Sequence, residues 1–162
     1  MRKIIAALAI TAATIATPVM AEETDFSGLR VAAIGGATYN GDDNPVYGGQ
    51  FGYDVEVNGA IFGVTGEYSD SENLGRDMAA TVRIGGRIDD NAMIYGTGGY
   101  TNLNLGEGAI TNNVEGYRLG AGGETKLGNF LVGVEYRFSS YDLPAAQRYN
   151  THGVVGTVGL RF

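Results

Sequence analysis

The chain of 162 residues carries a formal net charge of −7, which disfavours nucleic acid as a partner. It contains no cysteine, so disulfides do not stabilise it, and its length suits one domain. Its 27 glycines follow no collagen-like period, and together with ten tyrosines they favour β-structure over disorder.

Residues 1–21 have the organisation of a secretory signal peptide. An Arg-Lys pair forms a basic start, residues 4–15 form an apolar core, and small residues lead up to Ala21. We therefore predict cleavage after Ala21 and an exported mature domain at 22–162. A membrane anchor is the alternative, but the apolar core is shorter than a membrane-spanning helix requires.

The rest of the chain divides into eight runs in which apolar and polar residues alternate. Period-two alternation indicates β-strands with one apolar and one polar face, and about ten residues is the length that a tilted strand needs to cross a bilayer. The predicted strands are 26–39, 46–56, 60–69, 78–88, 92–104, 116–126, 130–141 and 150–162. In the run 92–104 the alternation does not show which face is which.

The connectors between the runs alternate between short and long. The short ones contain Asn, Asp or Gly, the residues of tight hairpin turns, and lie at 57–59, 89–91 and 127–129. The long ones are polar and acidic, and lie at 40–45, 70–77, 105–115 and 142–149. We therefore predict an all-β fold, an eight-stranded antiparallel up-and-down barrel with short turns at one end and long loops at the other. This division makes Asp77 a loop residue.

Charged residues of both signs gather on one face of the runs. In the run 78–88, for example, Val82 and Ile84 lie opposite Arg83 and Arg87. Because buried charges need partners of opposite sign, a closed barrel with these side chains inside would hold an ionic network. The predicted network is Arg30, Asp54, Glu67, Arg83, Arg87, Arg118, Glu124, Glu135, Arg137 and Arg161, and Glu56 shares their face. The alternative is ordinary solvated charge on a soluble sheet.

The positions of the aromatic residues indicate which face of the strands points out of the barrel. Those near the long loops are Tyr39, Tyr47, Tyr68, Tyr100, Tyr117, Tyr141 and Tyr149, and those near the short turns are Phe26, Tyr53, Phe62, Phe130 and Phe162. Two such bands match the interfacial girdles of a membrane barrel. We therefore predict a transmembrane barrel with apolar faces toward lipid and charges in the lumen. A soluble barrel with an apolar, lipid-binding interior is the alternative.

The last run ends VVGTVGLRF, in which Val158, Leu160 and Phe162 alternate on one face. This ending resembles the C-terminal assembly signal of bacterial outer-membrane barrels. Residues 22–162 as a whole resemble the small eight-stranded outer-membrane β-barrel family, the opacity-protein and OmpA-transmembrane-domain-like surface antigens of Gram-negative bacteria. The resemblance implies a place in the bacterial outer membrane, among its lipid and lipopolysaccharide. It also implies that the outer-membrane barrel assembly machinery reads the last strand.

No pattern in the sequence indicates a catalytic, cofactor-binding or metal site. His152 is the only histidine, and a hydrolytic pair with Ser139 or Ser140 is the one enzymatic arrangement left open. We predict a non-enzymatic protein with a structural or surface-antigen role. Its lumen would be plugged by Arg–carboxylate pairs, because side chains just fill an eight-stranded barrel. A small porin or passive channel, a soluble periplasmic lipid-binding barrel and a barrel-type lipid hydrolase are the alternatives. The oligomeric state is left open.

Overall fold

The computed structural model describes residues 25–39, 43–71, 75–104, 113–143 and 147–162. The predicted signal peptide lies outside the described residues. Within the described part of the chain, no helix has the length and apolar character needed to cross a membrane.

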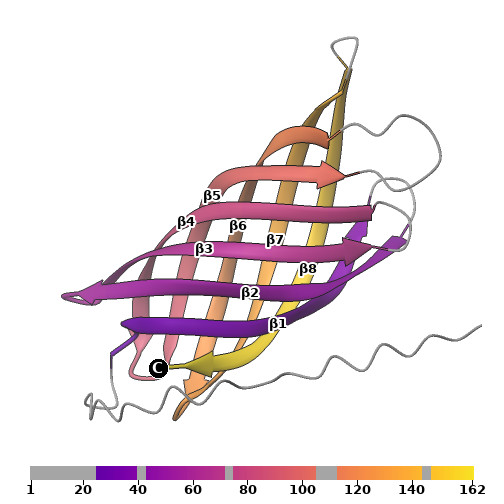
Figure 1. Cartoon of the computed structure of the whole chain (residues 1–162). Helices are drawn as coiled ribbons and strands as arrows, with labels where there is room; N and C mark the ends of the chain where they lie inside the picture. Colours follow the sequence, from indigo (N-terminus) through magenta and orange to yellow (C-terminus); the bar gives the residue numbers. More distant parts are fainter. Residues whose placement is uncertain (1–24, 40–42, 72–74, 105–112, 144–146) are drawn as a thin grey trace, which may run out of the picture.

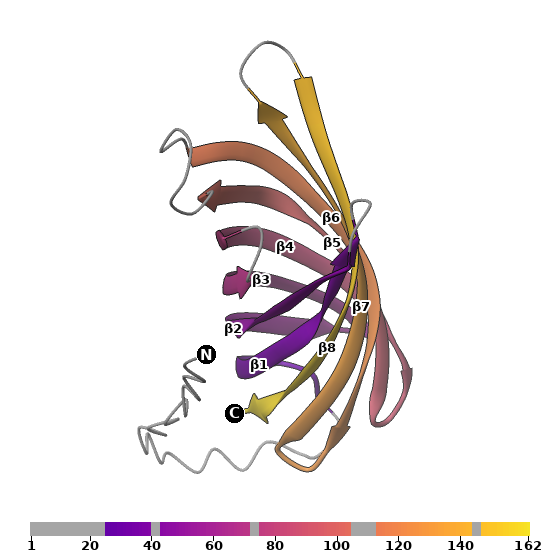
Figure 2. The same cartoon turned by 90° about the vertical axis from the view of Figure 1, so that its right-hand side faces the viewer.

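The described residues form a closed barrel of eight antiparallel strands, which confirms the predicted fold (Figure 1). Each strand pairs with its neighbours in the sequence, and the last strand pairs with the first. Figure 2 shows the strands curving round a common interior. The strands are β1 (Gly28–Tyr39), β2 (Asp43–Val57), β3 (Ala60–Ser71), β4 (Gly75–Asp89), β5 (Ala92–Asn104), β6 (Asn113–Leu127), β7 (Phe130–Leu143) and β8 (Gln147–Arg161).

The seam between β1 and β8 closes the barrel. Their register runs from Arg30 opposite Arg161 to Tyr39 opposite His152. At one end of the seam, the Leu29 amide donates to the Phe162 carbonyl at 3.0 Å and the Phe162 amide donates to the Leu29 carbonyl at 2.8 Å. With no free strand edge between β1 and β8, the backbone polar groups of the wall are paired, as hydrocarbon surroundings require.

The two ends of the barrel differ. We call the end with the turns at 58–59, 90–91 and 128–129 the short-turn end, and the opposite end the long-connector end. At the long-connector end the strands run further than predicted, since β2 begins at Asp43, β4 at Gly75 and β6 at Asn113. The prediction relied on an apolar outer face, whereas strand ends beyond the apolar band need none. Asp77 is therefore a buried residue of β4, and its assignment to a loop is wrong.

The structure also gives the phase of β5, which the alternation leaves open. Met93, Tyr95, Thr101 and Leu103 are buried in the lumen, whereas Ile94 and the other alternate positions face outward. Both faces of β5 carry large apolar or aromatic side chains, so hydropathy does not distinguish them.

A two-residue turn of Asn58 and Gly59 joins β2 to β3. Both residues have positive φ, 53° at Asn58 and 81° at Gly59, and the flanking residues Val57 and Ala60 pair across the hairpin. Positive φ at both central positions is the type I′ arrangement, whose twist matches that of the strands. Asn-Gly is the dipeptide that this turn prefers, so the sequence signal at 57–59 and the geometry agree.

Replacing Gly59 by Ala is expected to lower the free energy of unfolding by about 1 kcal/mol, because an L side chain disfavours this left-handed conformation. A Cβ at Gly59 would meet no atom within 4 Å, so the cost is conformational rather than steric. Gly35→Ala is the matched control, since a Cβ there also meets nothing but φ is not positive. Denaturant unfolding in detergent or lipid vesicles measures both, and equal effects would contradict this reading.

Candidate functional site

The outer wall of the barrel is apolar. Large apolar side chains that face outward include Val31, Val64, Val82, Ile84, Val134 and Val158, all between 47 % and 60 % exposed. The charged side chains at the middle of the strands, by contrast, are buried inside, among them Arg83, Arg118 and Arg137. This is the reverse of a soluble barrel and matches the arrangement predicted for a barrel surrounded by lipid.

Two of the predicted aromatic positions are wrong. Phe26 is fully buried at the short-turn end, and Tyr141 is 3 % exposed within the lumen. Both were assigned from their closeness to strand ends, which does not reveal the face. Tyr149 is half-buried and packs against the cluster that contains Tyr141. The others remain on the outer wall, largely exposed: Tyr39, Tyr47, Tyr53, Phe62, Tyr68, Tyr100, Tyr117, Phe130 and Phe162.

Five buried charges form a group near the short-turn end, which we call the short-turn cluster: Arg30, Asp54, Arg83, Glu124 and Arg161. They come from β1, β2, β4, β6 and β8, so the cluster reaches across the lumen rather than along one wall. Three guanidinium groups share two carboxylates in it.

Asp54 and Glu124 each contact two or more of these arginines. Arg161 Nη2 lies 2.9 Å from Asp54 Oδ2 and 2.7 Å from Glu124 Oε1. Arg83 Nη2 donates to Glu124 Oε2 at 2.9 Å, and Arg83 Nη1 lies 3.6 Å from Asp54 Oδ2. Arg30 Nε lies 3.5 Å from the same Asp54 oxygen. Bridging of this kind holds strands on opposite sides of the barrel together.

Arg83 also explains the apolar residues of β5. Its guanidinium carbon lies 3.6 Å from the centre of the Tyr95 ring, and its Nη2 lies 3.4 Å from Met93 Sδ. An aromatic face attracts a guanidinium, and polarizable sulfur packs well in irregular space. Met93 and Tyr95 thus pack against the Arg83 guanidinium, so their inward direction is consistent with a polar lumen.

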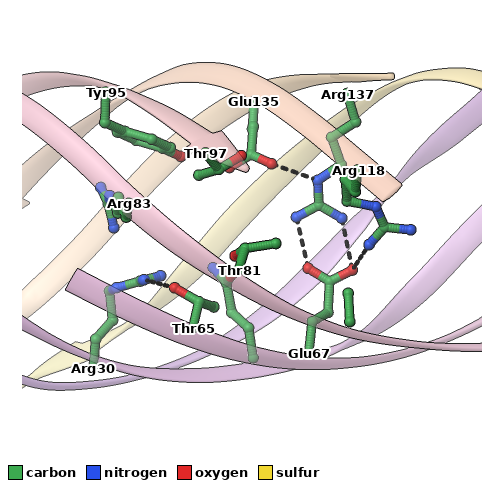
Figure 3. Close-up of a pocket in the computed structure, with 12 residues that line it drawn as sticks. Arg30, Thr65, Glu67, Thr81, Arg83, Tyr95, Thr97, Arg118, Glu135 and Arg137 are labelled. Carbon is green, nitrogen blue, oxygen red and sulfur yellow. Dashed lines mark hydrogen bonds and ion pairs between the residues drawn. The ribbon is translucent and has the colours of Figure 1, made fainter. Parts of the chain in front are cut away.

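The second group lies nearer the long-connector end, and we call it the connector cluster: Glu67, Asp77, Arg118, Glu135 and Arg137. Glu67 is at its centre, where Arg137 donates to both carboxylate oxygens at 2.7 Å and Arg118 donates to one of them at 3.0 Å. Arg137 Nε also donates to Glu135 at 2.7 Å, and Arg118 also pairs with Asp77. Figure 3 shows the contacts to Glu67 and Glu135. The two-pronged Arg137–Glu67 pair is the strongest type of charged hydrogen bonding in proteins.

Asp77 completes the charge balance of the lumen. With it, the two clusters contain five arginines and five carboxylates, three against two in the short-turn cluster and two against three in the connector cluster. The hydroxyl of Tyr141 donates to Asp77 at 3.2 Å, and Thr101 donates to its other oxygen. Balanced pairing is what makes so many buried charges tolerable.

The structure brings together nine of the ten side chains in the predicted network. The exception is Arg87, which lies at the short-turn end with its side chain 33 % exposed and 3.4 Å from Glu56. Lys126 is a further buried charge that the sequence reasoning missed, and it too lies at the short-turn end. In the sequence, Arg87 and Lys126 differ from the cluster charges only in lying near the ends of their strands.

Little open space is left between the side chains. A cavity of about 10 Å³ lies between the two clusters and is lined in part by Thr65, Thr81 and Thr97 (Figure 3). That is about the room that one water molecule needs. A second cavity, of about 40 Å³, lies toward the long-connector end beside Ser69 and Tyr141. Pockets for small organic ligands are far larger, roughly 300 Å³ or more.

His152 does not form a hydrolytic pair with serine. It faces outward from β8, where its Nδ1 lies 2.7 Å from the Tyr136 hydroxyl and its ring lies 5.2 Å from that of Phe138. Ser139 faces the lumen, where it accepts a hydrogen bond from Arg118 at 3.0 Å, whereas Ser140, the next residue of β7, falls on the outward-facing side and is covered there to 3 % exposure. The predicted approach is therefore wrong for Ser139, which lies on the opposite face from His152, and no hydrogen bond joins Ser140 to His152, whose Nδ1 is paired with Tyr136. Among the described residues, no group of three His, Asp or Glu side chains could hold a metal.

A closed antiparallel barrel that turns apolar side chains outward and pairs its charges inside is a transmembrane β-barrel. The sequence model of the outer membrane protein beta-barrel domain family matches residues 5–162. The chain belongs to this family, and it is a protein of the bacterial outer membrane. A comparison with curated protein sequences gives no match.

Solved structures of outer-membrane proteins have the same fold. Ail, the attachment invasion locus protein of Yersinia pestis, is 16 % identical, with a TM-score of 0.57 over 84 % of this chain and 97 % of Ail. Neisserial surface protein A is 10 % identical, with a TM-score of 0.54 over 83 % of this chain and 96 % of that protein. PagL, an outer membrane enzyme, is 16 % identical, with a TM-score of 0.55 over 82 % and 99 %. At these identities the likeness shows the fold and not the activity.

Proposed function

We propose that this protein is a non-conducting structural barrel and surface antigen of the outer membrane, with its lumen plugged by Arg–carboxylate pairs. The observation that carries the proposal is the paired filling of the lumen by the short-turn and connector clusters. An ion crossing the lumen would have to displace buried charges that already neutralise one another, which costs several kcal/mol per unpaired charge. The two cavities between the described lumen side chains, of about 10 Å³ and 40 Å³, have room for about one and a few water molecules.

The partners of the protein follow from its outer surface. Aromatic side chains at both ends favour contact with lipid at the level of the headgroups, which at the outer leaflet includes lipopolysaccharide. Short turns of such barrels face the periplasm and longer connectors the exterior, so an antigenic surface would lie at the long-connector end. Val158 and Phe162 are exposed on the outer wall of the last strand and its end, where the barrel assembly machinery could read them during insertion.

The proposal also makes the protein non-enzymatic. Histidine-dependent ester cleavage needs a nucleophile within hydrogen-bond reach of the ring. His152 has Tyr136 and Phe138 beside it on the outer wall, Ser139 lies inside with Arg118, and no hydrogen bond joins His152 to Ser140. An assay for release of acyl chains from lipid A or phospholipid would test this, and activity lost in His152→Ala would contradict it.

Planar-bilayer recording of the purified, refolded protein is expected to show no steady openings. The double variant Glu135→Ala with Arg137→Ala removes the Arg137–Glu135 and Arg137–Glu67 pairs and leaves Glu67 with Arg118 alone, so openings should appear in it. Val134→Ala with Tyr136→Ala is the matched control, because both residues lie on the outer wall of the same strand. It should stay closed. Persistent large openings in the unmodified protein would contradict the plug and favour a small porin.

A further inference from the structure

We propose that residues 25–27, just before β1, form a cap that closes the short-turn end of the lumen, with the Phe26 ring lying across the opening. We call this segment the N-terminal cap. The inference is independent of whether the two ionic clusters block ions, because it concerns the entry of water at one end.

Phe26 reaches the opposite side of the barrel. Its side chain is fully buried although it lies outside any strand, and it packs in one cluster with Ile61, Met93 and Tyr95. Met93 and Tyr95 belong to β5, which lies across the barrel from β1, to which Phe26 is joined, and Ile61 belongs to β3, two strands away from β1. A ring attached beside one wall and packed against the far wall lies across the opening. Its burial removes the apolar ends of β3 and β5 from water.

Hydrogen bonds attach the backbone of the cap to several strands. The Phe26 amide donates to Glu56 Oε2 at 2.9 Å, and the Glu56 amide donates to Ser27 Oγ at 2.8 Å, so the cap and β2 bind each other reciprocally. Lys126 Nζ of β6 donates to the Asp25 carbonyl at 2.7 Å. Arg161 of β8 donates to the Phe26 carbonyl. Three strands thus hold a segment of three residues.

Two cations near the Phe26 ring hold it in place as well. Lys126 Nζ lies 5.0 Å from the ring centre and the Arg161 guanidinium carbon lies 5.6 Å from it, both within cation–π range. Arg161 is also a member of the short-turn cluster, where it bridges Asp54 and Glu124. The cap therefore lies next to the short-turn cluster, and Arg161 contacts both.

The backbone at Gly28 lets the chain pass from the cap into β1. Its φ is 123°, and a Cβ there would lie 1.9 Å from the Phe162 carbonyl oxygen. Only glycine fits this conformation and this approach. The first residue of β1 and the end of β8 thus set the direction in which the cap leaves the strand. Opening of the cap requires loss of its own few contacts and not of the strand ladder, so it is a local event.

Cysteine accessibility tests the cap, because the chain has no cysteine of its own. Ile61→Cys places one thiol directly beneath Phe26. We would measure its rate of reaction with a small cationic methanethiosulfonate in the refolded, detergent-solubilised protein. With Phe26 present we expect slow labelling. With Phe26→Ala added we expect labelling at least about tenfold faster, since the barrier to local opening is removed.

Phe130→Ala is the matched control, because it deletes the same ring at the same end from the outer wall, where Phe130 is 63 % exposed. Its labelling rate should match that of Ile61→Cys alone. Heat-modifiability on gels checks that each variant is folded. If Phe26→Ala does not fold, Ser27→Ala removes one attachment of the cap without emptying the lumen and should accelerate labelling more modestly.

Fast labelling of Ile61→Cys with Phe26 in place would overturn the cap, and so would a rate that neither Phe26→Ala nor Ser27→Ala changes. These outcomes are distinct from failure of the ionic plug. A capless barrel that still conducts no ions would leave the plug intact, whereas a conducting barrel with a protected thiol would leave the cap intact.

Discussion

Glu67→Gln is expected to lower the free energy of unfolding by about 3–5 kcal/mol, the usual cost of removing one partner from a buried ion pair. Glu67 accepts three hydrogen bonds, two from Arg137 and one from Arg118. A neutral amide of the same size leaves the packing unchanged, so the loss reports the charge. Arg118 would then keep only Asp77 and Arg137 only Glu135, and the two clusters together would hold five arginines against four carboxylates.

Equilibrium unfolding of the refolded barrel in phospholipid vesicles measures this loss. Glu115→Gln is the matched control, because Glu115 is exposed and undergoes the same chemical change. It should change stability by less than about 0.5 kcal/mol. Combining Glu67→Gln with Arg137→Gln should cost less than the sum of the two single changes, since the pair is removed together. Additive effects would contradict direct coupling.

Arg83→Met and Arg87→Met are expected to differ strongly although both replace arginine in β4. Arg83 is 1 % exposed and pairs with Asp54 and Glu124, so its loss should cost about 3–5 kcal/mol. Arg87 has its side chain 33 % exposed beside Glu56, and its loss should cost less than about 1 kcal/mol. Methionine keeps much of the apolar stem in both cases.

The same unfolding experiment compares the two variants directly, with each serving as control for the other. Raising the salt concentration should reduce the effect of Arg87→Met, which is partly in solvent, and leave that of Arg83→Met nearly unchanged. Equal costs at the two positions would mean that the lumen is wet enough to screen its charges, and the proposed plug would then be wrong.

The fold could be predicted because alternation and turn chemistry agree along the chain. Val82 and Ile84 on one face with Arg83 between them require a wall with two different sides, and Asn58-Gly59 requires a tight hairpin. The strand ends could not be placed as well. At the long-connector end both faces of a strand are polar, so Asp77 has the sequence surroundings of a loop.

The members of the ionic network could be predicted better than their partners. Arg118 on β6 contacts Glu67 on β3, and these strands are not neighbours in the sheet. Such contacts depend on the width of the closed barrel and on the stagger of its strands, which periodicity does not encode. Phe26 shows a second limit of prediction from sequence. An aromatic residue just before the first strand has the same sequence surroundings whether its ring lies in lipid or across the lumen.

The pairing of β1 with β8 has a consequence for how the protein reaches its folded state. Every part of the wall short of the full circle has two open edges, and open edges are not tolerated in hydrocarbon. The β1–β8 pairing closes these edges, and its residues are far apart in the sequence. Contacts of such large sequence separation form slowly. Folding and entry into the bilayer are therefore expected to be completed together, once β8 has paired with β1.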